Sequence, residues 1–258
     1  MNRSSHLFLL RELVRREFTQ RYAGSLLGLA WSFIQPLWLL LLLSFVFSIV
    51  IRLPLDSEPT DRFWVFLFCG LLPWTAVHEG IQRSSTVITD HAEMVKKIRF
   101  PSEILVAAVV VTALIHEAIT MSFFLLALTL VGELVWQNLP LLLAALVLQV
   151  FLTLGLGFLM AGVQVFFRDT AQFLGMALNA WFYLTPIVFP IMIVPERYRG
   201  WIEANPLSAL VTMYRRALLG GGSLWVEGTL SLIICTVVAF IGGLWLFRRL
   251  KPGFSDEI

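Results

Sequence analysis

The run ILVAAVVVTALIHEAITMSFFLLALTLV, residues 104–131, determines the kind of fold that this sequence can adopt. Only His116 and Glu117 interrupt it with ionisable side chains. About 20 predominantly apolar residues in a helix are enough to cross the hydrocarbon core of a bilayer. The run therefore predicts a membrane-spanning helix that exceeds the minimum length, and we expect it to tilt or to project from the membrane.

The composition of the whole chain supports a membrane protein. Of its 258 residues, 58% are hydrophobic and 14% are charged, whereas soluble domains carry about 25% charged residues. With 21 Phe and 9 Trp, most of the surface cannot face water. Residues 1–258 are short enough to form one domain. The net charge of +2 gives no indication of a nucleic-acid partner, and the two cysteines lie in apolar runs, so neither a disulfide framework nor a metal site is expected.

Five further apolar runs are also about long enough to cross a membrane. Together they predict an all-α integral membrane fold with six transmembrane helices, at residues 29–51, 63–81, 104–131, 139–167, 171–194 and 229–247. Lys and Arg are concentrated in cytoplasmic connections of membrane proteins. Most of the 19 basic residues lie before the first span or in the connections on that same side. We therefore expect both termini to be cytoplasmic.

Residues 1–28 form a charged leader ahead of the first span. Within HLFLLRELVRREFTQRY, residues 6–22, apolar side chains recur at helical spacing and the charged ones fall on the opposite face. Such a basic amphipathic helix lies at a membrane surface. A partly disordered leader is the alternative. The apolar face consists of Leu7, Leu10, Leu13, Val14 and Phe18.

The connection at residues 82–103 is unusually charged for so apolar a chain. Asp90 is a candidate N-cap for a short cytoplasmic helix, and Glu93 three residues later completes a capping-box pattern. Phe100-Pro101 should end that helix, because the residue before a proline avoids the α conformation. Such a helix is suited to docking on a soluble partner, although a solvated loop has the same composition. The candidate docking side chains are Asp90, Glu93, Lys96, Lys97 and Arg99.

The connection at residues 195–228, on the opposite side, contains a second amphipathic helix. Asn205 is a candidate N-cap, Pro206 suits the first helical position, and Gly220 supplies a stop. This helix either lies flat on the membrane or re-enters it. Re-entry requires surrounding protein or a water-filled cavity. Its apolar face consists of Leu207, Leu210, Val211, Tyr214 and Leu218.

Motifs for catalysis are lacking in the sequence. It contains no phosphate-binding loop of the G-x-x-x-x-G-K-[ST] type, and neither His78-Glu79 nor His116-Glu117 continues as H-E-x-x-H. No catalytic or metal-binding residue is therefore expected. Ionisable groups in a membrane are functional candidates, and a proton relay is one interpretation of these doublets. The favoured one is that they pair across the second and third spans and hold the bundle together.

Aromatic residues are concentrated in the first and fifth spans. Most aromatics in membrane helices pack or lie at the interface. Aromatic faces with a few polar neighbours would nevertheless suit a passage for sugars, because they contact C–H groups without strong hydrogen bonds. The candidate channel-lining residues are Trp31, Trp38, Phe173, Trp181, Tyr183 and Phe189.

Five segments in order resemble one protein family. They are QRYAGSLLGLAWSFIQPLWLL (20–40), MVKKIRFPSEILV (94–106), FFRD (166–169), FYLTPIVFP (182–190) and NPLSALVTMYRRALL (205–219). The chain resembles, over nearly its whole length, the membrane permease subunit of bacterial ABC exporters for O-antigen-type polysaccharides, capsules and wall teichoic acids.

The resemblance implies a homodimer in the bacterial inner membrane, with two separate ATPase subunits that bind ATP and Mg²⁺. The cargo would be a polyprenyl-diphosphate-linked glycan. Residues 82–103 would dock on the ATPase, with Arg168 and Asp169 as a further contact. The diphosphate would enter near Arg21, Tyr22 and Ser25. Residues 195–228 would form an outer gate, with Asn205, Tyr214, Arg215 and Arg216.

Two alternatives to the exporter remain open from the sequence. One is a permease of the same architecture that moves a smaller lipid or drug. The other is a membrane enzyme or proton-coupled carrier that uses His116-Glu117 and needs no ATPase. The resemblance assigns no role to either His-Glu doublet.

Overall fold

The computed structural model describes residues 3–22, 28–55, 58–97, 100–221 and 228–258. This part of the chain consists of helices and connecting turns, with no β-strand. The elements are α1 (Arg3–Tyr22), η1 (Gly28–Ala30), α2 (Trp31–Ser44), η2 (Phe45–Val50), α3 (Phe63–Asp90), α4 (Ala92–Lys97), α5 (Glu103–Val131), η3 (Trp136–Asn138), α6 (Leu139–Phe166), α7 (Thr170–Tyr183), η4 (Ile191–Ile193), α8 (Glu196–Ala204), α9 (Pro206–Leu219), α10 (Thr229–Leu250), η5 (Lys251–Gly253) and α11 (Phe254–Glu257).

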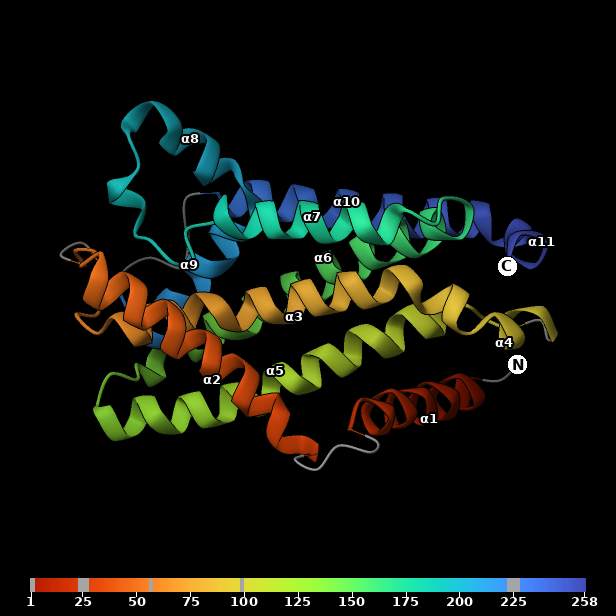
Figure 1. Ribbon diagram of the computed structural model, residues 1–258, viewed down its shortest axis with the longest axis horizontal. Coiled ribbons are helices and arrows are strands. Elements are labelled where there is room, and N and C mark those ends of the chain that lie inside the picture. The colour runs from red at the N-terminus through yellow and green to blue at the C-terminus, as the bar shows by residue number, and fades with distance from the viewer. Residues whose placement is uncertain (1–2, 23–27, 56–57, 98–99, 222–227) are drawn as a thin grey trace.

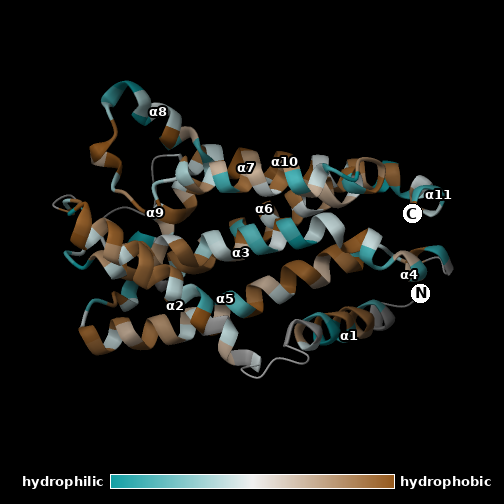
Figure 2. Ribbon diagram, in the orientation of Figure 1, coloured by the Kyte–Doolittle hydropathy of each residue, from teal (hydrophilic) through white to brown (hydrophobic). Residues whose placement is uncertain are grey.

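Long apolar helices make up the body of the molecule. Among the described residues, α3, α5, α6 and α10 are long and apolar enough to cross a membrane, and a shorter apolar helix runs over Ile34–Val50. These helices lie roughly side by side along the long axis of the molecule, and apolar residues dominate most of them (Figures 1 and 2). The chain is therefore an all-helical membrane protein.

Different elements lie at the two ends of the bundle. At one end lie α8 and α9, together with the connection between η2 and α3 (Figure 1). We call this the α9 end. At the other lie α4, α11 and the first residues of α1 (Figure 1). We call this the α4 end. The C-terminus, the start of the leader helix and the charged α4 thus share one end of the molecule.

The helix α3 forms the centre of the bundle, packed against α5, α6, α7 and α9. Another tight contact joins α6 and α10, where Gly155 and Gly243 meet backbone to backbone. A Cβ at either glycine would overlap the main chain of the opposite helix. Small residues of this kind allow membrane helices to approach closely.

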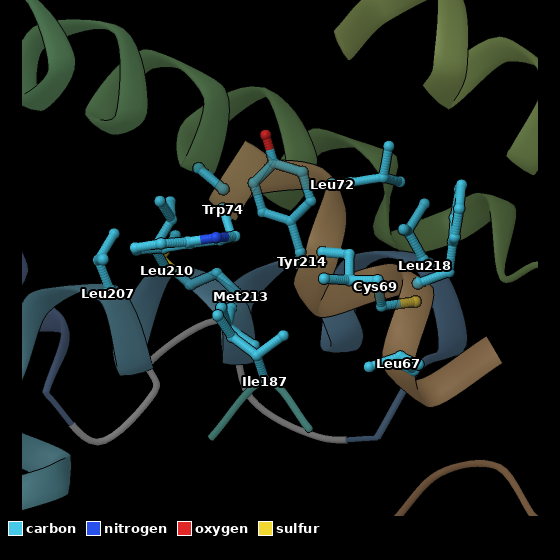
Figure 3. Packing of buried hydrophobic residues seen from close by; sticks show 14 of the residues in the cluster. Leu67, Cys69, Leu72, Trp74, Ile187, Leu207, Leu210, Met213, Tyr214 and Leu218 are labelled. Carbon is cyan, nitrogen blue, oxygen red and sulfur yellow. The ribbon is translucent and has the colours of Figure 1, made fainter. Parts of the chain in front are cut away.

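Helix α9 is buried inside the bundle rather than lying flat on it. All five residues of its predicted apolar face are buried, and they pack with residues of α3 (Figure 3). Its predicted ends are confirmed: the Asn205 side chain accepts a hydrogen bond from the Leu207 amide at 3.1 Å, Pro206 opens the helix, and Gly220 (φ 84°) follows its last residue. By contrast, α8 projects from the α9 end (Figure 1).

Two of the predicted spans have different limits in the structure. The helix expected at 63–81 continues to Asp90, because Ser85 and Thr89 donate their hydroxyls to carbonyls one turn earlier and so remain compatible with a helix. The helix expected at 171–194 ends at Tyr183. Thr185-Pro186 follows at once, and a proline removes an amide donor and disfavours helix in the residue before it.

The predicted N-cap of α4 is wrong. Asp90 is the last residue of α3, and its carboxylate accepts a hydrogen bond from the Thr86 hydroxyl at 2.8 Å. The chain turns at His91 instead, whose carbonyl accepts the first backbone bond of α4, from the Met94 amide at 2.9 Å. The short helix itself was predicted correctly, but it is separated from α3 by a single residue.

The leader forms the expected helix, α1, which packs on α5. Its predicted apolar face is only partly buried: Leu13 is 4% exposed, whereas Leu7 is 68% exposed. The buried side also carries a charged residue, Glu17, which the periodic pattern did not predict.

Candidate functional site

A cavity of about 630 Å³ with both apolar and polar walls lies between α2, α3, α5 and α7. Its apolar walls include Trp38, Trp74, Phe182 and Tyr183. Both His-Glu doublets line it, together with other polar side chains that a membrane interior would otherwise exclude. The polar lining includes His78, Glu79, Arg83, His116, Glu117 and Asn179. The cavity thus brings together groups from segments about 100 residues apart in sequence.

The two doublets meet across helices α3 and α5, as predicted. The His116 Nδ1 atom lies 3.2 Å from Glu79 Oε1. The same carboxylate oxygen is 3.6 Å from a terminal nitrogen of Arg83, one turn further along α3. Glu79 is therefore shared between an imidazole and a guanidinium, and it fixes the relative position of two wall-forming helices.

A second polar cluster begins at Glu117, which is only 4% exposed. Its Oε2 accepts a hydrogen bond from the Gln149 side-chain amide of α6 at 2.6 Å, and its Oε1 accepts one from the Tyr214 hydroxyl of α9 at 2.7 Å. Tyr214 also contacts Gln149 Oε1. Figure 3 shows the tyrosine hydroxyl pointing out of the apolar cluster that surrounds its ring. This triad connects α5, α6 and α9 behind the cavity wall.

The predicted aromatic lining is only partly assembled. Trp38 and Tyr183 face the cavity. Trp181 instead donates its indole N–H to the Asn205 side chain at 2.8 Å, and Phe189 packs against the hydrophobic core. Trp31 and Phe173 are exposed and do not line the cavity. Of the six predicted channel-lining residues, Trp38 and Tyr183 thus line this cavity, and the lining of a channel stays a prediction from the sequence.

The four predicted gate residues are mostly held by internal contacts. Asn205 caps α9, and Tyr214 belongs to the buried triad. Arg215, 4% exposed, donates to the carbonyls of Pro186 and Ile187 at 2.8 and 2.9 Å, and its guanidinium carbon lies 3.6 Å from the centre of the Phe66 ring.

The remaining predicted gate residue, Arg216, accepts a hydrogen bond at its backbone carbonyl from the side-chain amide of Asn138 at 3.0 Å. Arg215 and Arg216 also line a second cavity of about 230 Å³ at the α9 end. Glu58 lies in the same lining, where burial raises the pKa of its carboxyl and the nearby Arg215 opposes that rise.

The predicted docking residues lie at the α4 end. Asp90, Glu93 and Lys96 are exposed around α4, and Arg168 and Asp169 are exposed in the turn between α6 and α7. Gln164 holds this turn: its side-chain amide donates to the Arg168 carbonyl at 2.8 Å, and its side-chain oxygen accepts from the Ala171 amide at 2.7 Å. The described residues of the two predicted contact segments thus include exposed charged side chains in both.

Several predicted site residues lie outside the described part of the structure. These are Ser25 and Arg99, and also the side chains of Arg21, Tyr22 and Lys97, whose backbones lie in α1 and α4. The predicted diphosphate entry site therefore stays a prediction from the sequence.

Helix α4 rests on the C-terminal segment of the chain. α11 contacts α4, and Phe254 is fully buried in the same apolar cluster that Met94 and Val95 of α4 pack against. Lys251 fixes this segment through an ion pair with Glu103 at 2.7 Å, at the start of α5. The C-terminal segment thus packs against α4 and holds it in place.

The sequence matches the family model described as ABC-2 type transporter over residues 9–219, which run from α1 through the last residue of α9. The chain belongs to the ABC-2 type transporter family. The matched region contains the cavity, the buried triad and α4. The resemblance found in the sequence motifs is therefore confirmed at the level of the family.

Curated relatives of this ABC-2 family chain cover almost its full length. It is 29% identical to the O-antigen export system permease protein RfbA of Myxococcus xanthus, over 97% of this chain and 95% of that protein. It is 27% identical to the RfbA protein of Klebsiella pneumoniae, over 96% and 94%. It is 25% identical to the polysialic acid transport protein KpsM of Escherichia coli, over 92% and 91%.

Two contributors to the polar contacts at the site of this ABC-2 family chain were missed from the sequence. Gln149 lies in an apolar run, and Arg83 was counted only as a positive-inside charge. One signal could have identified Arg83: it lies four residues after Glu79, so the two side chains lie on one helical face.

Proposed function

We propose that this chain is the channel-forming permease subunit of an ATP-driven exporter in the bacterial cytoplasmic membrane. Its cargo would be a polyprenyl-diphosphate-linked polysaccharide of the O-antigen or capsule type. Two copies form the channel, and each carries one ATPase subunit. The names of the full-length relatives support both the class of transporter and the class of cargo.

The cavity between α2, α3, α5 and α7 carries this proposal. Binding sites for organic ligands combine apolar and aromatic walls with a few convergent polar groups. Here Trp38, Trp74 and Tyr183 offer apolar surface to sugar C–H faces, while Asn179 and Arg83 offer donors to sugar hydroxyls. A smaller lipid or drug would not require that so many hydrogen-bonding groups be kept in the membrane interior.

The arrangement at the α4 end supports the proposal that an ATPase docks there. On this proposal α2 with η2, α3, α5, α6, α7 and α10 make six crossings, which leave both termini on the cytoplasmic side. α9 then re-enters from outside and closes the bundle. Glu93 and Lys96 on α4, with Arg168 and Asp169, form the surface for the ATPase. Arg21, Tyr22 and Ser25 would receive the lipid diphosphate, since a cationic side chain forms charge-assisted hydrogen bonds with phosphate oxygens.

The test is purification of the tagged chain in mild detergent from membranes of cells that express the whole exporter. We expect an ATPase subunit to co-purify at one per permease. The double variant Lys96→Glu with Lys97→Glu should lose that subunit and export while the permease stays folded. The matched control is Arg197→Glu with Arg199→Glu, which reverses two charges on α8 at the opposite end.

Export by a preparation without any ATPase would contradict the proposal and would favour a proton-coupled carrier. Loss of the ATPase in the α8 control as well would show that charge reversal acts without regard to position. Normal surface glycan after deletion of this chain, with altered drug or lipid efflux, would favour the smaller-cargo permease.

A further inference from the structure

A series of ionisable side chains connects the cavity with the start of α4. It contains five residues from α1, α3, α5 and the turn between α3 and α4. In order from the cavity these are His116, Glu79, Arg83, Glu17 and His91. His116, Glu79 and Arg83 line the cavity, whereas Glu17 and His91 do not. We call this series the ionic chain.

The contact at the centre of the ionic chain is the shortest. The Arg83 guanidinium lies 2.6 Å from Glu17 Oε2, a charge-assisted hydrogen bond between α3 and α1. The other side of the same guanidinium is 3.6 Å from Glu79 Oε1. Arg83 therefore has two carboxylate partners, one in the cavity wall and one on the leader helix. Any ligand group that binds Glu79 or Arg83 changes how the arginine is divided between them.

The last contact reaches the docking helix. The second oxygen of Glu17 lies 3.9 Å from His91 Nε2, and this contact is ionic when the imidazole is protonated. The other ring nitrogen of His91 contacts the Val87 carbonyl of α3 at 3.0 Å. The His91 backbone carbonyl accepts bonds from the amides of Met94 and Val95, so it forms the start of α4. A shift of Glu17 is thus transmitted to the residue that orients α4.

Burial sets the ionic chain apart from ordinary surface pairs. Glu17 is 7% exposed although the leader helix has a solvated face on which a carboxylate would cost nothing. A buried carboxylate is costly unless it is paired, so its position depends on Arg83. If Glu17 and Arg83 served only to anchor α1 on the bundle, the bond between the two side chains would be enough. The contacts continue on both sides, into the cavity and towards α4.

We propose that Glu17, Arg83 and His91 are positioning residues that couple occupancy of the cavity to the orientation of α4. This rests on the proposed function, because it requires an ATPase docked on α4. When cargo enters, it competes for Glu79 and Arg83, and the altered bond to Glu17 moves α1 relative to His91. The ATPase then responds to cargo through α4 and not only through contact with the glycan.

The test compares Glu17→Gln, His91→Gln, Arg83→Gln and the double variant of Glu17 and Arg83 in the co-purified complex in proteoliposomes. The readout is ATP hydrolysis with and without polyprenyl-diphosphate-linked glycan extracted from the same membranes. Glu17→Gln and His91→Gln should keep the ATPase stoichiometry and the basal hydrolysis rate. Their stimulation by glycan should fall by about two- to 30-fold, as expected for substitutions along a coupling network. The double variant should lose no more than the more affected single variant, because members of one network are not additive.

Glu133→Gln is the control, because it removes an ion pair that lies at the α9 end and outside the ionic chain. In that pair the Arg62 Nε atom lies 3.1 Å from Glu133 Oε1. The stimulation of this variant should stay at the wild-type level. Wild-type stimulation in both Glu17→Gln and His91→Gln, or equal losses in the control, would overturn the inference while leaving the proposed function intact. A wild-type complex that contains no ATPase would overturn the proposed function, and the inference with it.

Discussion

At the scale of single residues, the buried triad of Glu117, Gln149 and Tyr214 explains why an apolar bundle retains a carboxyl group. A buried carboxyl is tolerated where its oxygens are hydrogen-bonded. Glu117 meets this condition through donors from two other helices, at 2.6 and 2.7 Å. The triad thus fixes α9 in place without requiring any reaction at Glu117.

The first prediction concerns Tyr214→Phe. The variant removes one hydroxyl and leaves oxygens of Glu117 and Gln149 without its hydrogen bond. The free energy of unfolding should fall by about 1–3 kcal/mol, the usual cost of an unsatisfied buried polar group. Thermal unfolding in detergent measures this. Tyr183→Phe is the control, because that side chain is exposed and outside the triad. Equal unfolding temperatures for the two variants would contradict the importance of the triad.

Arg215, which the family resemblance places in an outer gate, is held by internal contacts. In the structure its guanidinium binds the backbone carbonyls of Pro186 and Ile187, just after the end of α7. Both residues are buried in the turn that follows the helix, where backbone carbonyls need hydrogen-bond donors, and this side chain supplies them.

At the scale of elements, the contact of α6 with α10 depends on one glycine of an adjacent pair. Gly243 faces the backbone of Gly155, whereas a Cβ on Gly242 would meet no atom within 4 Å. We predict that Gly243→Ala lowers the free energy of unfolding by about 1–3 kcal/mol, because overpacking forces the helices apart. Gly242→Ala is the matched control and should unfold like the wild type. A comparable loss in both variants would show that the close contact at Gly243 is not responsible.

Local signals in the sequence predicted some elements well. Asn205-Pro206 and Gly220 determined both ends of α9, because cap residues act through their own backbone neighbours. Hydropathy predicted the wrong helix end at two places. The residues at the end of α3 are polar although the helix continues through them, and the residues after Tyr183 are apolar although the helix has ended. A hydropathy window measures the preference of side chains for lipid and does not detect helix ends.

The site was less predictable than the fold. The pairing of the two doublets could be anticipated, because both lie in long apolar helices where lone charges need partners. The partners of Glu117 could not be anticipated. Tyr214 is 97 residues away in the chain and Gln149 is 32 residues away, on helices whose register is fixed only by the packing of the whole bundle.

At the scale of the whole molecule, the two ends of the bundle should face opposite sides of the membrane. We predict that a membrane-impermeant maleimide labels Trp201→Cys, on α8, from outside intact cells. Trp201 is 82% exposed. Ser255→Cys, exposed on α11, should react only in inverted vesicles. Cys69 and Cys235 are replaced by alanine beforehand. Labelling of both positions from one side would contradict the proposed topology.

The length of α3 has a mechanical consequence. Its 28 residues extend about 42 Å at about 1.5 Å each, whereas the hydrocarbon core is about 30 Å thick. On the proposed topology the helix projects from the lipid at the end that carries α4. Inside the helix, Pro73 lacks the amide hydrogen of a regular helix residue, and the cavity residue Trp74 follows it. The part of α3 between Pro73 and Asp90 thus joins the cavity wall to the start of α4 through one continuous helix. On the proposed function, an ATPase that binds α4 would act on the cavity wall through this helix.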